Sequence, residues 1–321
     1  MKTLQEQIRN EAKRLLEGQE VSMVVGYGQG SDAFRTTPIF IKDVGKVDQL
    51  IINPFTSNNL VKYLMDLAHG DKKVAVVVKG CDSRSVNRLV QDNQLERDKV
   101  IVLGVPCGGQ LDLKKLNGQL DPRGELIEVT DNGDSFQVKT SQGEATFNKS
   151  EYLMDKCLVC ESSVPVSTDM LLTYDKKPIT KGELYQGVKD FEKLSTEEKN
   201  AFWQRQFDKC IRCYACRNIC SACSCRECVF DMAEPNWIGK RTNLSENHMF
   251  HLTRAIHVAG RCVDCGECDR VCPMDIPLRL LNQKVLKDAK ELFDVGTPGA
   301  NPEEPAALGY YRKDDPEEFH G

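Results

Sequence analysis

The sequence predicts an α/β domain with a small β-hairpin extension, followed by a mainly α-helical domain that is rich in cysteine. Short apolar runs alternate with helix-like segments in the first third of the 321 residues, as in a parallel sheet with crossover helices. Further on, the chain has two runs of four closely spaced cysteines, which we call the first and second ladder: Cys210, Cys213, Cys216 and Cys220, and Cys262, Cys265, Cys268 and Cys272. Apolar residues at helical spacing lie between the two ladders and after the second. We expect the α/β domain over residues 1–160, a connector over 161–205, the cysteine-rich domain over 206–295 and an extended tail over 296–321.

The α/β domain is expected to begin with a helix over residues 1–18, where apolar side chains recur at helical spacing. The apolar runs that predict strands lie at residues 21–25, 38–41, 50–52, 74–78 and 100–103. Helices are expected near residues 57–67 and 83–95. Residues 125–147 then predict a polar pair of hairpins with Asn-Gly and Gln-Gly turns.

Three glycines follow the first predicted strand, at Gly26, Gly28 and Gly30. One interpretation is a phosphate-binding loop, and the other is an ordinary glycine-rich turn. The spacing is not GxGxxG, and Pro38 begins another apolar run where a helix would be needed. The sequence therefore favours the ordinary turn.

The two cysteine ladders share the spacing C-x2-C-x2-C-x3-C. In this pattern three thiolates hold one [4Fe-4S] cluster, and the fourth reaches across to the other cluster. The first ladder continues with Ser221, where the second has the usual proline, Pro273. The pattern predicts cluster 1 at Cys210, Cys213, Cys216 and Cys272, and cluster 2 at Cys262, Cys265, Cys268 and Cys220.

The gap between the ladders predicts a helix over residues 245–259, with Ser245 as its N-cap. Its apolar side chains share one face, and these are Met249, Leu252, Ile256 and Ala259. Its three histidines, His248, His251 and His257, are expected to be surface or packing residues. A second stripe after Pro277 predicts another helix. Helices between and after the ladders favour a ferredoxin-like domain of the α-helical type over a compact one.

Four other cysteines predict a third metal site. Cys81 and Cys107 follow two predicted parallel strands, at the sheet edge where α/β proteins place their sites, and Cys157 and Cys160 form a CxxC pair. Four thiolates beside two cubanes favour a third [4Fe-4S] cluster over zinc. A catalytic dithiol is the weaker alternative, since no histidine lies near either half.

Three more cysteines, Cys223, Cys225 and Cys228, exceed what the two ladders need. They could replace a ladder ligand, join a fourth cluster, or pack near the sulfurs without a metal. The sequence leaves these alternatives open.

The composition limits the classes of partner. A formal net charge of −5 gives no indication of a nucleic-acid partner. Neither a signal peptide nor an apolar run long enough for membrane insertion is visible, so we expect a cytoplasmic protein whose 15 cysteines bind metal and do not form disulfides. The tail, residues 296–321, is rich in proline and acid and includes Tyr310 and Tyr311. It is expected to be disordered or to lie on a partner as an arm.

The cysteine motifs resemble those of a known family. Lys79-Gly-Cys-Asp82, Val105-Pro-Cys107 and Lys156-Cys-Leu-Val-Cys160 are similar to the pattern of the coenzyme F420-reducing hydrogenase and formate dehydrogenase β-subunit family. The two ladders resemble the dicluster 2[4Fe-4S] ferredoxin domain that is fused to relatives of that family, and the α-helical type occurs in partner subunits of fumarate and heterodisulfide reductases. The resemblance implies an electron-transfer subunit in an anaerobe, beside a formate dehydrogenase, a hydrogenase or a heterodisulfide-reductase-like flavoprotein.

One segment departs from the family. Members that bind FAD and F420 carry an Ala-Asp-Ile-type segment soon after the CxxC, whereas residues 161–169 here read ESSVPVSTD. We therefore expect at least two [4Fe-4S] clusters, and three with the N-terminal site, while flavin is not favoured.

The sequence thus predicts an iron–sulfur electron-transfer subunit of a cytosolic oxidoreductase complex, with catalytic or flavoprotein subunits as its partners. No acid–base pair, nucleophile or substrate pocket is visible, so no catalytic residue is assigned. One alternative is a flavin-containing β subunit of the FAD and F420 type. The other is a non-catalytic assembly or redox-sensing protein whose clusters mainly stabilise the fold.

Overall fold

The structure is a computed structural model that describes residues 2–68, 70–173 and 182–305. Its first sheet has the strand order β2-β1-β3-β4-β8. The central strands β1, β3 and β4 are parallel, β8 extends the parallel part, and β2 is antiparallel to β1. The strands are β1 (Val21–Gln29), β2 (Thr36–Ile41), β3 (Lys73–Val78), β4 (Val100–Gly104) and β8 (Met170–Leu171). The predicted N-terminal α/β architecture is confirmed.

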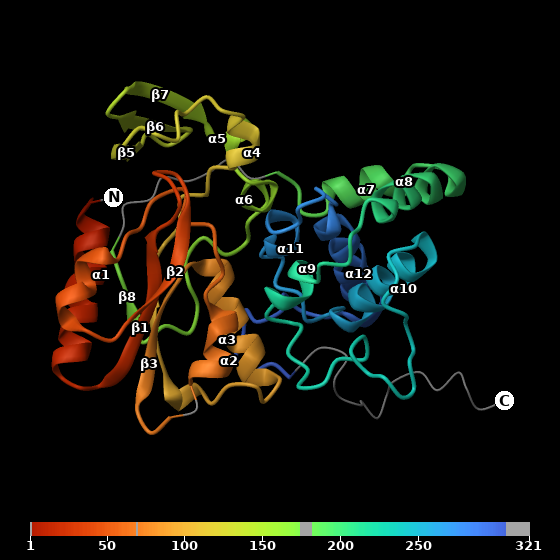
Figure 1. The fold of residues 1–321 in the computed structure, drawn as a ribbon, viewed down its shortest axis with the longest axis horizontal. Coiled ribbons are helices and arrows are strands. Elements are labelled where there is room, and N and C mark those ends of the chain that lie inside the picture. The colour runs from red at the N-terminus through yellow and green to blue at the C-terminus, as the bar shows by residue number, and fades with distance from the viewer. Residues whose placement is uncertain (1, 69, 174–181, 306–321) are drawn as a thin grey trace.

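Helices cover both sides of this sheet. Helix α1 (Lys2–Glu17) lies on one side, whereas α2 (Leu64–Leu67) and α3 (Gly80–Gln91) lie on the side towards the C-terminal helices (Figure 1). Because β3 is central and covered on both faces, all its residues after Lys73 are buried apolar residues. Short 3-10 helices connect the elements, at η1 (Val44–Gln49), η2 (Val61–Tyr63) and η3 (Arg97–Lys99).

A second sheet of three antiparallel strands follows, in the order β5-β6-β7. Its elements are β5 (Leu126–Asp131), β6 (Ser135–Thr140), β7 (Gly143–Asn148) and the short helices α4 (Leu113–Leu116), α5 (Lys149–Tyr152) and α6 (Asp155–Leu158). Phe136, Val138 and Phe147 form a separate apolar core, and Cys157 lies at its border. The predicted hairpin pair is confirmed, and its packing fixes the first cysteine of the CxxC pair.

The C-terminal part is helical, and its ladder segments lie on the side towards the N-terminal half (Figure 1). Its helices are α7 (Gln186–Glu192), α8 (Thr196–Asp208), α9 (Ala215–Asn218), α10 (Leu244–His257), α11 (Glu267–Arg270) and α12 (Leu278–Phe293). Phe207, Phe250 and Ile276 form its core together with the ladder residues Cys216 and Cys268. The predicted cysteine-rich helical domain is confirmed, and its apolar core is built directly around thiols.

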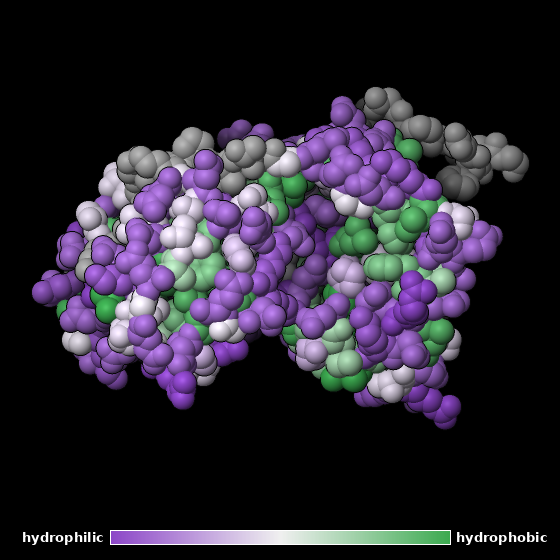
Figure 2. Space-filling model, turned by 90° about the horizontal axis from the view of Figure 1, so that it is seen from above, coloured by the Kyte–Doolittle hydropathy of each residue, from purple (hydrophilic) through white to green (hydrophobic). Residues whose placement is uncertain are grey.

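Polar contacts join the two halves, which meet along a furrow in the molecular surface (Figure 2). Arg261 lies 2.6 Å from Asp92 at the end of α3, and Lys62 donates a 2.7 Å hydrogen bond to the carbonyl of Cys223. These contacts hold α3 and η2 against the segments that flank the ladders.

Several predicted elements are wrong. Residues 50–52 form no strand, because Leu50 ends η1 and packs where a side chain on Gly26 would otherwise lie. Gly26 and Gly28 are themselves inside β1 and are paired with β2, so they form neither a turn nor a phosphate loop. The helix expected over residues 57–67 begins only at η2, where the side chain of Asn59 accepts from the N–H of Val61.

The apolar stripe of α10 faces solvent, although apolar residues at helical spacing predict a face that packs on the core. The N-cap is Asn243, not Ser245, and its side chain accepts from the N–H of Glu246. Met249 and Ile256 are 55% and 66% exposed. The buried face instead carries Asn247, Phe250, His251, Arg254 and Ala255. Polar side chains are buried on this face because it lines the cysteine ladders.

The start of the predicted tail packs on its own chain. Asn87 and Gln91 of α3 donate hydrogen bonds of 2.8 and 2.9 Å to the carbonyls of Gly299 and Asn301. Residues 306–321, with the tyrosine pair, lie outside the described residues, so the predicted arm stays a prediction. In the ranges that the structure describes, no helix has both the length and the apolar character needed to cross a bilayer.

Candidate iron–sulfur centres

The two ladders adopt the same backbone conformation. The residues on either side of the second cysteine have left-handed φ angles, 54° and 60° at Arg212 and Tyr214, and 54° and 68° at Asp264 and Gly266. Alternation of right- and left-handed residues directs successive N–H groups into a concavity that favours negative charge. The repeated spacing in the sequence therefore corresponds to a repeated, anion-binding loop.

The four thiols predicted for cluster 1 are neighbours. Burial, followed by the charges of Cys272 and Cys213, raises the pKa of Cys210. Burial and the charges of Cys210, Cys272 and Cys213 raise the pKa of Cys216 to about 11. Cys272 comes from the second ladder, so the chain crosses over between ladders as the spacing predicts.

The thiols predicted for cluster 2 also lie together. Burial, the Glu267 carboxylate and Cys220 raise the pKa of Cys265 to about 12. Cys262 has its pKa raised by burial, Asp264, Cys220 and Cys265. The reciprocal crossover, from Cys220 of the first ladder, is thus present. Iron ligation itself stays a prediction.

Hydrogen-bond donors point at the ladder sulfurs. The backbone N–H groups of Arg212 and Ile276 lie 3.4 Å from the Sγ atoms of Cys210 and Cys272. The side-chain amide of Asn282 on α12 donates to Cys268 Sγ at 3.5 Å. Donors of this kind stabilise thiolate charge and are one of the protein's means of setting a cluster potential.

His251, like Asn282, was not predicted from the sequence to contact a ladder sulfur. Its Nε2 lies 3.3 Å from Cys210 Sγ, and its ring stacks on Phe207 at 4.7 Å. Burial, assisted by the charges of Arg254 and Arg212, lowers its pKa to about 3, so the imidazole is neutral. Among the described residues its Nδ1 has no hydrogen-bond partner, which favours the tautomer with the proton on Nε2. The prediction of a surface or packing role is therefore incomplete for His251.

Arg254 lies between the two ladders. Its guanidinium donates a 3.1 Å hydrogen bond to the carbonyl of Cys216 and is 3% exposed. Burial opposes its charge, but the thiols of Cys220, Cys223, Cys268 and Cys216 raise its pKa well above the usual value. A buried cation among so many thiols is a counter-charge for thiolates or for the anionic clusters they hold.

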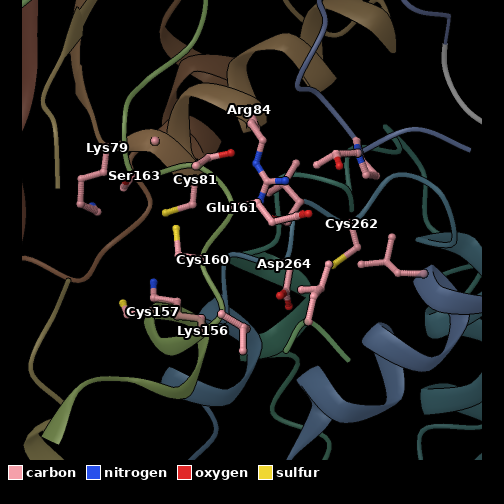
Figure 3. Close-up of a pocket in the computed structure, with 18 of the residues that line it drawn as sticks. Lys79, Cys81, Arg84, Lys156, Cys157, Cys160, Glu161, Ser163, Cys262 and Asp264 are labelled. Atoms are coloured by element: carbon pink, nitrogen blue, oxygen red, sulfur yellow. The ribbon is translucent and has the colours of Figure 1, made fainter. Parts of the chain in front are cut away.

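The four N-terminal cysteines line one cavity of about 60 Å³, together with Cys262 of the second ladder. Figure 3 shows the sulfurs of Cys81 and Cys160 facing each other across it. Burial and Cys160 are among the causes that raise the pKa values of Cys81 and Cys107. Cys157 has its pKa raised to about 12 by burial, Cys107 and Cys160. The structure thus brings together the four residues that the sequence grouped.

The sheet explains the position of Cys81. β3 ends at Val78, and α3 begins at Gly80, so Cys81 lies in the first turn of that helix. Lys79 is buried beside it, 2.7 Å from Asp82, and also donates hydrogen bonds to Tyr27 Oη (2.5 Å) and to the carbonyl of Asn58 (2.9 Å). Because β1 and β3 are neighbours, this network ties the thiol site to the sheet.

Lys156 connects the N-terminal site with the second ladder. Burial opposes its charge, but Cys81, Glu267, Cys157 and Cys265 together raise its pKa. A Cβ on Gly266 would lie 2.9 Å from Lys156 Cδ, so the glycine permits this close approach. The ammonium therefore lies near thiols that the sequence assigned to two different clusters.

The donor sets fit [4Fe-4S] clusters better than a single metal ion. Within the described ranges, no three His, Cys, Asp or Glu side chains are close enough to hold one ion. The thiols nonetheless converge in fours, with their pKa values raised by burial and by one another. Soft thiolates spaced around a common centre, with N–H donors and buried cations, suit an anionic cubane and not zinc.

The three additional cysteines lie at one edge of this assembly. The thiol of Cys223 donates to the sulfur of Cys220, which lowers the pKa of Cys220 and raises that of Cys223. Cys223, Cys225 and Cys228 line a second, larger cavity of about 450 Å³. None of them lines the cavity between the N-terminal site and the second ladder.

Comparison with known proteins gives a family match over part of the chain. Residues 71–174 match the family described as the C terminus of the beta subunit of coenzyme F420 hydrogenase/dehydrogenase. This range contains Cys81, Cys107, Cys157 and Cys160, the motifs on which the resemblance in the sequence was based.

Two relatives match over most of their length. The F420-dependent formate dehydrogenase subunit beta of Methanocaldococcus jannaschii is 28% identical, over 83% of this chain and 84% of the relative. The F420-dependent formate dehydrogenase 1 subunit beta of Methanococcus maripaludis is 26% identical, over 92% and 91%. A solved chain of the F420-reducing [NiFe] hydrogenase complex from Methanosarcina barkeri aligns with a TM-score of 0.41 and 17% identity, over 50% of this chain and 62% of that one.

Proposed function

Since the chain belongs to the coenzyme F420 hydrogenase/dehydrogenase β-subunit family, we propose that it is an iron–sulfur electron-transfer subunit of an oxidoreductase complex. It would hold three [4Fe-4S] clusters: two in the crossed ladders and one at Cys81, Cys107, Cys157 and Cys160. The clusters would supply one-electron acceptors and donors. The protein's own contribution is to bind them, to set their potentials and to keep them close to one another.

The observation that carries this proposal is the cavity shared by two of the sites. Cys262 lines the same cavity as the four N-terminal thiols, and Lys156 interacts with thiols of both sets. Electron tunnelling falls steeply with distance, so adjacent sites are what a relay requires. A protein that used its clusters only to stabilise the fold would not need this adjacency.

The buried side chains would set the charge around each cluster. Arg254 and Lys156 offer positive charge where reduction adds an electron, and His251 and Asn282 offer hydrogen bonds to ligand sulfurs. These interactions favour the reduced forms and would raise the potentials. Apolar side chains such as Phe207 and Phe250 exclude water from the ladders.

The outer edge of the first ladder suits exchange with a partner. Cys213 is exposed, and Ile211 beside it is 54% exposed. The exposed apolar stripe of α10, which includes Met249 and Ile256, lies on the helix that carries His251. We propose that a catalytic or flavoprotein subunit docks here, by analogy with relatives named as β subunits of formate dehydrogenases.

A second candidate is a flavin- or F420-using β subunit, and one observation favours it. A cavity of about 490 Å³ lies between the N-terminal half and the second ladder, and Phe34, Phe55, Arg35, Arg270 and Arg279 line it. These aromatic and cationic side chains suit a planar, anionic cofactor, whereas Asp112, Asp155, Asp269 and Asp275, which line the same cavity, oppose one. The relatives' names contain F420, although the segment after the CxxC departs from the family's pattern.

Anaerobic purification followed by iron, sulfide and flavin analysis tests the proposal. At least about twelve irons, without flavin, and EPR signals after dithionite reduction are expected for three cubanes. About eight irons would restrict the relay to the ladders. One flavin per chain would support the second candidate, and clusters that dithionite cannot reduce would contradict a relay.

A further inference from the structure

Three thiols and one imidazole line the cavity at the three additional cysteines. Cys223, Cys225 and Cys228 line it from the loop that follows the first ladder. His257 lines it from the C-terminal turn of α10. The cavity measures about 450 Å³. Three thiols and one imidazole thus border a single space that neither predicted ladder cluster occupies.

The same cavity is strongly cationic. Its lining cations are Lys62, Arg217, Arg226, Arg254 and Arg261. Among its lining residues the only carboxylate within the described chain is Asp231, and Arg217 pairs with it at 2.9 Å. Arg261 also forms an ion pair with Asp92, which does not line the cavity. The net positive charge therefore calls for an anionic occupant.

One of these cations lacks a partner on one nitrogen. Arg254 is 3% exposed, and its Nε makes no hydrogen bond. The same guanidinium contacts the thiol of Cys223. Arg254 thus places a buried positive charge at the wall of the cavity, and this charge favours an anionic occupant.

The thiols that line the cavity indicate which kind of anion it binds. The arginines could bind a phosphate, but a phosphate does not bind to thiols. Thiolate and imidazole are instead ligands of iron–sulfur clusters. A single zinc ion does not suit the site, because no three such side chains in the described residues are close enough to share one ion. The thiols of the two ladders are likewise too far apart in the described residues to share one ion, as is expected of ligands that surround a cubane.

We propose that this cavity binds an additional, fourth iron–sulfur cluster, with the thiolates of Cys223, Cys225 and Cys228 and the imidazole of His257 as its ligands. With three thiolates the cluster is anionic, and Arg254, Lys62 and Arg217 balance that charge. The hydrogen bond between Cys223 and Cys220 places the cluster directly beside the second ladder site. The inference holds whether or not the N-terminal cysteines carry a cluster of their own.

The test compares the full-length chain with Cys225→Ser/Cys228→Ser after anaerobic reconstitution with iron and sulfide. Cys223 is left in place because it contacts Cys220. The double variant should lose about four irons relative to the parent, and the EPR signals of the ladder clusters should remain. An unchanged iron content would overturn the proposal. Loss of every cluster signal together would overturn it as well, because the site would then be inseparable from the ladders.

Pulsed EPR of the reduced protein tests the imidazole ligand. The parent should show strong nitrogen-14 coupling that disappears in His257→Ala, a variant at an exposed position. His248→Ala is the matched control, because His248 is on the same helix but does not line the cavity. Coupling that is absent from the parent, or that survives in His257→Ala, would overturn His257 as a ligand. These readouts do not depend on the Cys157 site. The test of the N-terminal cluster with Cys157→Ser can therefore give either result without changing the outcome for the fourth cluster.

Discussion

The imidazole Nε2 of His251 lies 3.3 Å from Cys210 Sγ, although 41 residues separate the two in the chain. This contact crosses from α10 to the first ladder and lies in the apolar core around Phe207. A neutral N–H donor to a ligand sulfur stabilises the reduced cluster.

Replacing His251 with alanine should therefore lower the midpoint potential of cluster 1 without removing its iron. EPR-monitored redox titration measures the change. His248→Ala is the control, since His248 packs on Phe207 at 5.0 Å but contacts no ladder sulfur in the described structure. An unchanged potential in His251→Ala would show that the contact does not act on the cluster.

Replacing Lys156 with methionine should lower the potentials of both neighbouring clusters, because a buried positive charge is removed near Cys81 and Cys265. Methionine keeps the stem that packs on Gly266. Lys139→Met, at an exposed position on β6, should leave both potentials unchanged. A shift in only one cluster would contradict the bridging position assigned to Lys156.

Cys157→Ser should remove about four irons and leave the ladder signals intact, because its thiol groups with Cys107 and Cys160. Iron analysis and EPR of the same sample measure both effects. If all signals vanish together, the three sites form one interdependent metal core.

Cys213→Ala should damage cluster 1, which Cys210, Cys213, Cys216 and Cys272 would hold. Since cluster binding and folding are coupled, the thermal stability of the helical domain should fall as well. Iron content, EPR and thermal unfolding by circular dichroism measure these effects. Unchanged iron and EPR would refute the assignment of this ladder.

Gly299→Ala should loosen the segment over residues 295–304 from α3. At Gly299, φ is 73°, and a Cβ would lie 2.2 Å from the carbonyl oxygen of Arg84. Because this segment also lines the N-terminal thiol cavity, an iron chelator should strip that site faster. Gly118→Ala is the control: φ is 78° there, but no atom lies within 4 Å of the added Cβ.

Both variants carry the strain of a left-handed alanine, about 1–3 kcal/mol. Only Gly299→Ala adds the collision with Arg84. Equal chelation rates in the two variants would mean that the segment does not protect the site.

The cysteine groups were predicted from ligand spacing, which is a local property of the chain, and their binding of iron stays a prediction. The crossover from Cys272 to the first ladder and from Cys220 to the second follows from that spacing alone. The strand ends at Val78 and Gly104 were equally predictable, since buried parallel strands form continuous apolar runs.

The surrounding residues were not predictable, because they come from distant segments. Lys156 adjoins the CxxC in sequence, but its approach to Cys265 depends on how the two halves pack. The apolar stripe of α10 predicted a buried face, whereas the polar face is buried against the ladders. The periodicity of apolar residues does not reveal a core that is built from thiols and the charged side chains around them.

The most direct test of the relay is iron and acid-labile sulfide analysis of the anaerobically purified chain, combined with EPR after dithionite reduction. The account predicts at least about twelve irons, a matching amount of sulfide, and clusters that accept electrons. A preparation that binds fewer than about eight irons after reconstitution, or whose clusters stay oxidised in dithionite, would contradict it.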